Sequence, residues 1–199
     1  GEDSLNECMH VYGGFDHNLQ TLRIIMFLEN KYLKFKGLNL TLETIDGLLK
    51  HNGPFEDLSK LNTLIGVKNL KGKINFSKFP SLEAQISAIS DDIAYNNHDI
   101  QDGIQAQLFT LNDLIEIDFF KQIFKSHKKN KKGKNEEILI YQIIRDSINL
   151  MVQDLINTTM KNINSLKIKN CNDVYNSKKH LVSFSHRLIK IEKEIKQFL

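Results

Sequence analysis

The chain has 199 residues, and its 27 Lys and Arg against 24 Asp and Glu give a formal net charge of +3. Seven lysines lie between Lys121 and Lys134, a stretch without acidic residues, which leaves 20 basic against 24 acidic groups elsewhere. The positive charge therefore belongs to one segment. This excludes a basic surface along the whole chain, so nucleic acid is not an expected partner.

Composition narrows the class of protein further. Hydrophobic residues at 41% and charged residues at 26% are typical of a globular domain with a buried core. No apolar run approaches the roughly 20 residues that span a bilayer, so we expect no membrane partner. The two cysteines, Cys8 and Cys171, exclude a disulfide scaffold and favour a reducing compartment, which predicts a cytoplasmic location.

Helical periodicity runs through nearly the whole chain. Apolar residues recur at intervals of three and four, and capping residues such as Asp16, Thr41 and Ser81 stand where helices would begin. There is no convincing pair of strands and no internal repeat, so the predicted fold class is all-α. The expected helices cover residues 2–11, 15–32, 41–50, 81–108, 111–125, 136–166 and 186–199.

Two segments interrupt this pattern. Residues 55–79 have no sustained period and contain Gly66 and Gly72, which predicts a long irregular connection. Residues 126–135 are rich in lysine and predict a solvated, mobile loop. Lysines without interleaved aromatic residues are usually only solvated, and contact with nucleic-acid phosphates is the alternative interpretation of this loop.

The predicted helix over residues 81–108 carries a stripe of polar side chains. The spacing i, i+4, i+7, i+8 and i+11 places five of them on one helical face: Asp91, Tyr95, His98, Asp99 and Asp102. Asp91 and Asp99 would lie about 12 Å apart along the helix, too far to share one metal ion but suited to opposite ends of a nucleotide. The alternative is a solvated polar face. A second face is predicted to be buried: Leu82, Ile86, Ile89, Ile93, Ile100 and Ile104.

A second candidate site follows Gly13 and Gly14, where His17 falls in the first turn of a predicted helix. The positive end of the helix dipole favours anions at that position, and an imidazole can transfer protons near neutral pH. The alternative is a surface histidine or one that caps the helix.

Several segments together resemble the bacterial deoxyguanosinetriphosphate triphosphohydrolase-like proteins of the HD-domain superfamily. The segments are residues 1–7, 13–23, 37–54 (GLNLTLETIDGLLKHNGP) and 80–108 (PSLEAQISAISDDIAYNNHDIQDGIQAQL), with weaker likeness up to 181–185. The run Glu83-Ala84-Gln85, followed by Asp-Asp-Ile-Ala-Tyr, is the most specific part. The resemblance implies an HD-domain-like helical bundle, incomplete in this sequence.

The resemblance also implies a reaction, the hydrolysis of a deoxynucleoside triphosphate to the deoxynucleoside and inorganic triphosphate with a divalent metal such as Mg²⁺ or Mn²⁺. It implies that Asp91 is a metal ligand and that Tyr95 and Asp99 face the deoxyribose. The catalytic residues implied are Glu2 and His17, with His17 assisting proton transfer near the α-phosphate. Further substrate-binding residues implied are Arg145 and Lys50.

The sequence contains only part of the set of metal ligands that the resembled family uses. In the resembled family the ion is held by one histidine, a His-Asp doublet and a later aspartate. Only the last falls within this sequence, as Asp91, and the others would lie upstream of Gly1. We therefore expect residues 1–199 to be a partial triphosphohydrolase domain, truncated at both ends, that holds no metal tightly and is inactive alone.

Two partner arrangements are compatible with this expectation: a homo-oligomer, or a complex with an upstream HD fragment. The leading interpretation is a truncated triphosphohydrolase. The alternative is a non-catalytic helical chain, either nucleotide-binding or an oligomer interface, that pairs with a separate HD-bearing chain.

Overall fold

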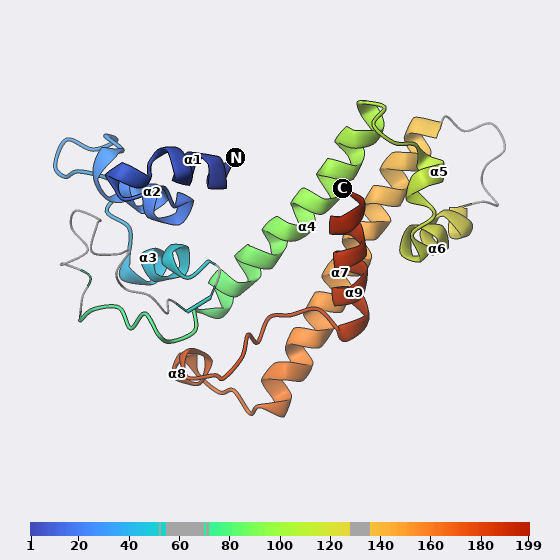
Figure 1. The fold of residues 1–199 in the computed structure, drawn as a ribbon. Helices are drawn as coiled ribbons and strands as arrows, with labels where there is room; N and C mark the ends of the chain where they lie inside the picture. The colour runs from blue at the N-terminus through green and yellow to red at the C-terminus, as the bar shows by residue number, and fades with distance from the viewer. Residues whose placement is uncertain (52, 55–69, 71, 128–135) are drawn as a thin grey trace. The chain divides into compact units, whose positions relative to one another are not determined.

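The structure is a computed structural model, and it describes residues 1–51, 53–54, 70, 72–127 and 136–199. Within these residues helices are the only regular elements, which confirms the all-α prediction. Most of the predicted irregular connection at 55–79, and most of the lysine-rich loop at 126–135, lie outside the described residues. Figure 1 shows the helices: α1 (Glu2–Cys8), the 3-10 helix η1 (His10–Tyr12), α2 (His17–Arg23), the π-helical turn η2 (Ile24–Leu28), α3 (Leu42–Leu49), α4 (Leu82–Gln105), α5 (Leu111–Leu114), α6 (Asp118–His127), α7 (Glu136–Ser165), α8 (Cys171–Tyr175) and α9 (His186–Phe198).

The chain divides into two compact units. The first contains Gly1–Ala88 and Ile168–Leu181, and the second contains Ile89–Lys167 and Val182–Leu199. The long helix α4 begins in the first unit and ends in the second, so its two ends belong to different cores.

The core of the first unit forms where α2 packs on α3. Its buried members are all at most 7% exposed: Leu22, Ile45, Leu49, Leu70, Ile74 and Phe76. Leu22 comes from α2, and Ile45 and Leu49 occupy one face of α3 because they are four residues apart. Burial of such side chains is the main source of stability for a short helix like α2.

The predicted capping residues start three of the helices. Asp16 accepts a hydrogen bond from the backbone N–H of Leu19 at 3.0 Å, and Thr41 accepts one from Thr44 at 3.3 Å. At the start of α4, Ser81 Oγ accepts from the Ala84 backbone N–H at 3.3 Å. Each contact satisfies an N–H that has no partner within its own helix.

The second unit is built on α7. Its buried side chains follow one face of the helix: Ile143, Ile144, Ser147, Met151, Leu155 and Thr159. The later part of α4 contacts this face, since Asn97 Nδ2 lies 3.5 Å from Met151 Sδ. The start of α9 is tied to α7 as well, because the Ser185 backbone N–H donates to Asp154 Oδ2 at 2.8 Å. Figure 1 shows α4 as a continuous helix throughout.

The buried face of α4 matches the prediction only in part. Ile93 and Ile100 are buried, at 4% and 0% exposure. Ile86 is 46% exposed, and the buried positions also include Gln85 and Asn97. Gln85 is satisfied by the chain around it, because its amide donates to Pro80 O at 2.9 Å and accepts from the Leu181 backbone N–H at 2.9 Å.

The prediction of one helix over residues 111–125 is wrong. The structure has two short helices, α5 and α6, separated by a turn. On a continuous helix Leu114 and Phe120 would point about 120° apart, whereas the break allows both to be fully buried. A capping box between Thr110 and Asp113 starts α5, with the Asp113 carboxylate accepting from Thr110 N at 2.8 Å.

The predicted helix over 15–32 is shorter than expected, and one helix was missed. The helical run ends at Leu28 because the chain turns back, and the Leu38 backbone N–H donates to Ile25 O at 2.7 Å. Gly37 permits this approach, since a Cβ there would lie 2.3 Å from Met26 O. The missed helix is α8, which begins with a capping box between Asn170 and Asp173.

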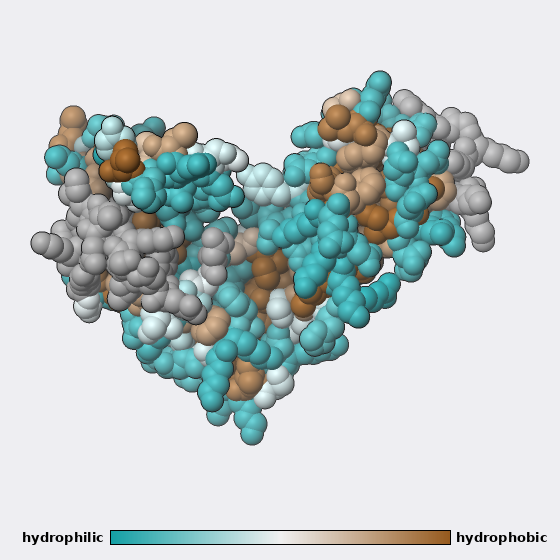
Figure 2. Space-filling model, in the orientation of Figure 1, coloured by the Kyte–Doolittle hydropathy of each residue, from teal (hydrophilic) through white to brown (hydrophobic). Residues whose placement is uncertain are grey.

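The surface of the chain mixes polar and apolar side chains. Figure 2 shows hydrophilic residues over much of the visible face, with hydrophobic patches between them. The most exposed large hydrophobic residues include Leu33, Val11, Tyr12 and Leu108. Among the helices of the described residues, none combines the length and the apolar character needed to cross a bilayer.

Candidate functional site

Glu2 and His17 form a hydrogen-bonded pair in the first unit. One carboxylate oxygen of Glu2 accepts from the His17 backbone N–H at 3.0 Å, and the other lies 2.7 Å from His17 Nδ1. Because an ionised carboxylate only accepts hydrogen bonds, Nδ1 carries the proton in this contact. The opposite ring nitrogen, Nε2, has no hydrogen-bond partner among the described residues. Both side chains are about half exposed, at 53% and 44%.

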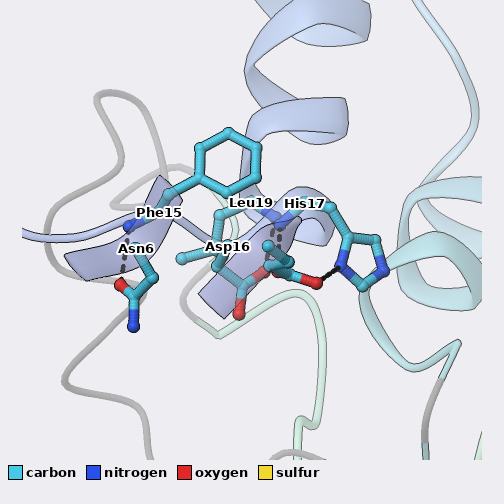
Figure 3. Close-up of polar contacts among 6 residues, drawn as sticks. Asn6, Phe15, Asp16, His17 and Leu19 are labelled. Atoms are coloured by element: carbon cyan, nitrogen blue, oxygen red, sulfur yellow. Dashed lines mark hydrogen bonds and ion pairs between the residues drawn. The ribbon is translucent and has the colours of Figure 1, made fainter. Parts of the chain in front are cut away.

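The turn before α2 sets up this pair. Asn6, one helical turn after Glu2 on α1, accepts from the Phe15 backbone N–H at 2.8 Å. Gly14 adopts φ +81°, and a Cβ there would lie 2.5 Å from Asn6 Oδ1. Figure 3 shows Asn6 against Phe15, and Asp16 and His17 together at the start of α2. Two side chains of α1 therefore hold the turn before α2 and the first residue of α2 by polar contacts.

The polar stripe of α4 lies exposed in the second unit. Asp91, Asp99 and the other members are exposed, and Tyr95 is 63% exposed. Within the described residues, none of the five stripe residues makes a hydrogen bond or ion pair through its side chain. The structure thus leaves the carboxylates and the phenol available to a ligand, and it equally allows the alternative of a solvated polar face.

Contacts with α7 behind the stripe, and with α9 beside it, fix α4. Asn97 is 1% exposed, and its amide donates to Ile93 O at 2.8 Å and touches Met151 Sδ. Asp92 accepts from Lys196 Nζ on α9 at 3.1 Å. Burial lowers the pKa of Lys196, but the hydrogen bonds and negative charges of Glu192 and Asp92 together outweigh that effect, so the pKa is raised. These contacts set the rotation of α4 and so the direction of its stripe.

Arg145 lies on α7 in the second unit, with an exposed side chain. Its Nη1 donates to Gln142 Oε1 at 3.2 Å. Gln142 in turn donates to Asp146 Oδ1 at 3.0 Å, and Asp146 Oδ2 lies 2.5 Å from His127 Nε2 on α6. No local sequence pattern indicates the contact between His127 and Asp146, since they belong to different helices and are 19 residues apart.

Lys50 is buried at the end of α3 in the first unit. Its side chain is 2% exposed, and its Nζ lies 2.5 Å from Asp46 Oδ1. Burial raises the pKa of Asp46, an effect that the hydrogen bond and charge of Lys50 partly offset. Lys50 also borders a cavity of about 270 Å³ that Lys73 and Tyr175 help to line. A phosphate would have to compete with Asp46 for this ammonium group.

The predicted site residues therefore fall into two groups. Glu2, His17 and Lys50 belong to the first unit. Asp91, Tyr95, Asp99 and Arg145 belong to the second. Within each group the structure shows Glu2 bonded to His17, and Asp91, Tyr95 and Asp99 aligned on one helical face.

The described residues do not fit a metal site by themselves. They contain no group of three or more His, Cys, Asp or Glu side chains placed to hold an ion. Asp91 is a single carboxylate, and protein sites for catalytic metals generally use three or more ligands. A metal at Asp91 would require ligands from outside the described residues.

Comparison with known proteins finds relatives that carry the name of the family that the sequence motifs resemble. The chain is 69% identical over 199 residues to a deoxyguanosinetriphosphate triphosphohydrolase-like protein of Pelagibacter ubique (strain HTCC1062), and it covers 54% of that relative. Proteins of the same name from Bartonella henselae and Rickettsia rickettsii (strain Iowa) are 40% and 39% identical over alignments of 203 and 199 residues. All of the chain is covered in each case.

The whole of this chain aligns with part of proteins named deoxyguanosinetriphosphate triphosphohydrolase-like protein. It spans about half the length of these curated relatives, covering 51% of each of the last two. No family model matches the chain.

Proposed function

We propose that the chain forms part of a deoxynucleoside triphosphate triphosphohydrolase, which releases the deoxynucleoside and inorganic triphosphate by attack of water at the α-phosphate. The relatives' name supports this class of reaction. Because the chain spans about half of each relative, its residues would supply part of the active site, and the rest would come from other segments.

The observation that carries the proposal is the contact between Glu2 and His17. A carboxylate that accepts from Nδ1 fixes the orientation and tautomer of an imidazole, and it stabilises the ring when the ring gains a proton. Nε2 is then the atom that gives or takes a proton beside the α-phosphate. His17 is the proposed acid or base, and Glu2 is the group that orients it.

The stripe on α4 is the proposed deoxyribose site. Tyr95 and Asp99 are four residues apart, so their positions differ by about 6 Å along the helix and lie on the same face. A tyrosine ring under the sugar excludes a 2′-hydroxyl by its bulk, and a carboxylate accepts a hydrogen bond from the 3′-hydroxyl. Asp91 lies one turn before Tyr95 and is the proposed metal ligand, for a divalent ion such as Mg²⁺ or Mn²⁺, provided that further ligands complete the site.

Arg145 is the proposed contact for the triphosphate. Water attack at the α-phosphate breaks the bond to the 5′-oxygen, so the deoxynucleoside is the leaving group and the triphosphate stays on the phosphate side. A guanidinium can donate two hydrogen bonds to the phosphate oxygens of that triphosphate and stabilise their negative charge. Lys50 is a second candidate for this role only if substrate releases it from Asp46.

Binding of dGTP and GTP to the chain tests the sugar site directly. We expect dGTP to bind about tenfold more tightly than GTP, and Asp99→Ala to remove most of the affinity for dGTP. Asp102→Ala is the matched control, because Asp102 is an exposed carboxylate on the same stripe with no proposed role. Equal affinity for the two nucleotides, or equal effects of the two substitutions, would contradict the proposed sugar site.

Measurements of turnover test the proposal that this chain supplies only part of the active site. We expect no triphosphate release from dGTP by the chain alone with Mn²⁺. We expect activity when it is mixed with the part of the Pelagibacter ubique relative that lies outside the aligned region. Release by the chain alone would show that its residues suffice for catalysis. Nucleotide binding without activity, both by the chain alone and in the mixture, would favour the alternative of a non-catalytic nucleotide-binding chain.

A further inference from the structure

Arg145 is the last member of a series of hydrogen bonds that begins on another helix, α6. His127, the last residue of α6, contacts Asp146 on α7. The two side chains are 22% and 33% exposed, so this contact is partly shielded from water. Hydrogen bonds between an ionised acceptor and a ring N–H are stronger than neutral ones, particularly when water is partly excluded.

The chemistry of each group fixes the direction of the series. An ionised Asp146 can only accept, so it takes the His127 Nε2 proton on one oxygen and the Gln142 amide N–H on the other. The amide nitrogen of Gln142 must therefore face Asp146. Its oxygen is then turned toward Arg145 Nη1, at 3.2 Å. A rotated amide would present its NH₂ group to the guanidinium, and neither group could accept.

We infer that His127 and Asp146 are positioning residues for Arg145, acting through Gln142 to hold its guanidinium in one direction on α7. This inference rests on the proposed function for its purpose, the binding of a triphosphate. The ordering of Arg145 itself does not depend on that purpose. His127 and Asp146 do not touch the substrate in this scheme.

A second arginine in the same unit provides a comparison within the molecule. Arg187 on α9 donates from Nη2 to Gln122 Oε1 at 3.3 Å, nearly the same contact. Gln122 is exposed, and among the described residues no carboxylate accepts from its amide. Arg187 should therefore be less ordered than Arg145, although both rest on a glutamine.

The composition makes the test simple. The chain has three arginines, Arg23, Arg145 and Arg187, so its arginine Nε–Hε NMR spectrum holds three side-chain signals that single Arg→Lys substitutions assign. In the unsubstituted chain we expect the Arg145 signal to show a higher order parameter than the Arg187 signal. We also expect inorganic tripolyphosphate to shift the Arg145 signal.

Substitution of His127 separates positioning from folding. His127→Phe removes the donor to Asp146, and we expect the order parameter of Arg145 to fall and its affinity for tripolyphosphate to weaken about threefold to tenfold. His127→Gln keeps a donor and should restore both. Gln142→Leu should have the effect of His127→Phe without touching α6, and Gln122→Leu should free Arg187 alone. The backbone amide spectrum identifies any variant that fails to fold.

The outcomes distinguish this inference from the proposed function. An unchanged Arg145 signal in folded His127→Phe and Gln142→Leu variants would overturn the inference. If Arg145 loses order in these variants but tripolyphosphate never shifts its signal, the positioning network stands and the phosphate role in the proposed function fails.

Discussion

Two sets of candidate side chains, the first Glu2 with His17 and the second Asp91, Tyr95 and Asp99 of α4, are prepared for a ligand in different ways. Glu2 and His17 come from separate helices and hold each other through hydrogen bonds of 3.0 and 2.7 Å. Asp91, Tyr95 and Asp99 come from one helix and, within the described part of the chain, make no side-chain hydrogen bonds. Contacts between elements therefore create the geometry of the first set, whereas the regular backbone of α4 creates that of the second.

The difference has consequences for stability. None of the residues of α1 is buried, so the position of Glu2 depends on polar contacts with the turn before α2. The stripe on α4 is supported from behind by buried side chains such as Ile93 and Ile100. We expect the first set to be disturbed by small changes in its turn, and the second only by damage to the core that holds α4.

The largest effect is expected from Ile100→Ala, which should lower the free energy of unfolding by about 2–5 kcal/mol. Ile100 is 0% exposed, and the smaller side chain leaves a cavity beneath the stripe. Ile86→Ala, on the same helix but 46% exposed, should cost at most about 1 kcal/mol. Urea unfolding measures both. Equal costs would show that the core does not support α4 in this way.

The next effect is expected in the turn that joins α1 to α2. Gly13 and Gly14 both have positive φ, at +100° and +81°, so Gly→Ala should cost about 1–2 kcal/mol at either position. Gly14→Ala should cost about 1 kcal/mol more, because the Cβ displaces Asn6 from Phe15, whereas nothing lies within 4 Å of a Cβ at Gly13.

Besides urea unfolding, the NMR signals of the His17 ring distinguish Gly13→Ala from Gly14→Ala. Loss of the contact with Glu2 should appear as averaging of the two ring ¹⁵N shifts in Gly14→Ala and not in Gly13→Ala. The comparison fails if both variants keep, or both lose, the ordered ring.

A smaller effect is expected from Glu2→Gln. The contact is about half exposed, so its loss should lower the free energy of unfolding by about 0.5–1 kcal/mol, including the favourable charge near the start of α2. Glu7→Gln removes the same charge from the same helix and is the control. The decisive measurement is the tautomer of His17, which should become mixed only in Glu2→Gln; a mixed tautomer in the unsubstituted chain would contradict the structure.

The smallest effect is expected from pH. Burial lowers the pKa of His180, in the first unit, below its ordinary value of 6.5. The unfolded chain then binds the proton more readily, so stability should fall as the pH drops through about 6.5 and level off below the folded pKa. His180→Phe keeps a ring against Phe79 and should flatten this dependence.

Asp113 in the second unit should respond at a lower pH. Hydrogen bonds from Thr110 lower the pKa of Asp113 below 3.8, so the stabilisation by its carboxylate is present above pH 3.8 and is lost as the pH falls through the folded pKa. The pKa of Asp46 in the first unit is raised, so protonation of Asp46 stabilises the folded chain as the pH falls. This contribution is present both in the unsubstituted chain and in His180→Phe, so it cancels when the two are compared. A pH dependence between 6.5 and 5 that is the same in His180→Phe and in the unsubstituted chain would contradict the role of His180.

Local patterns predicted much of the secondary structure. The caps at Asp16, Thr41 and Ser81 are confirmed because a side-chain oxygen beside free backbone N–H groups needs no tertiary partner. The break between α5 and α6 was not predicted, because it depends on burying Leu114 and Phe120 together. The capping box of Asn170 and Asp173 was a local signal for α8 that could have been used.

The sequence by itself determined the helical class, the stripe of Asp91, Tyr95 and Asp99, and the family resemblance. These follow from helical period and motif order, which are properties of neighbouring residues. Only the tertiary structure decided that Glu2 lies on His17, that Lys50 is buried against Asp46, and that His127 reaches Asp146. Contacts within a helix follow from its fixed rise and turn, whereas contacts between helices depend on how their buried faces pack and on which turns connect them.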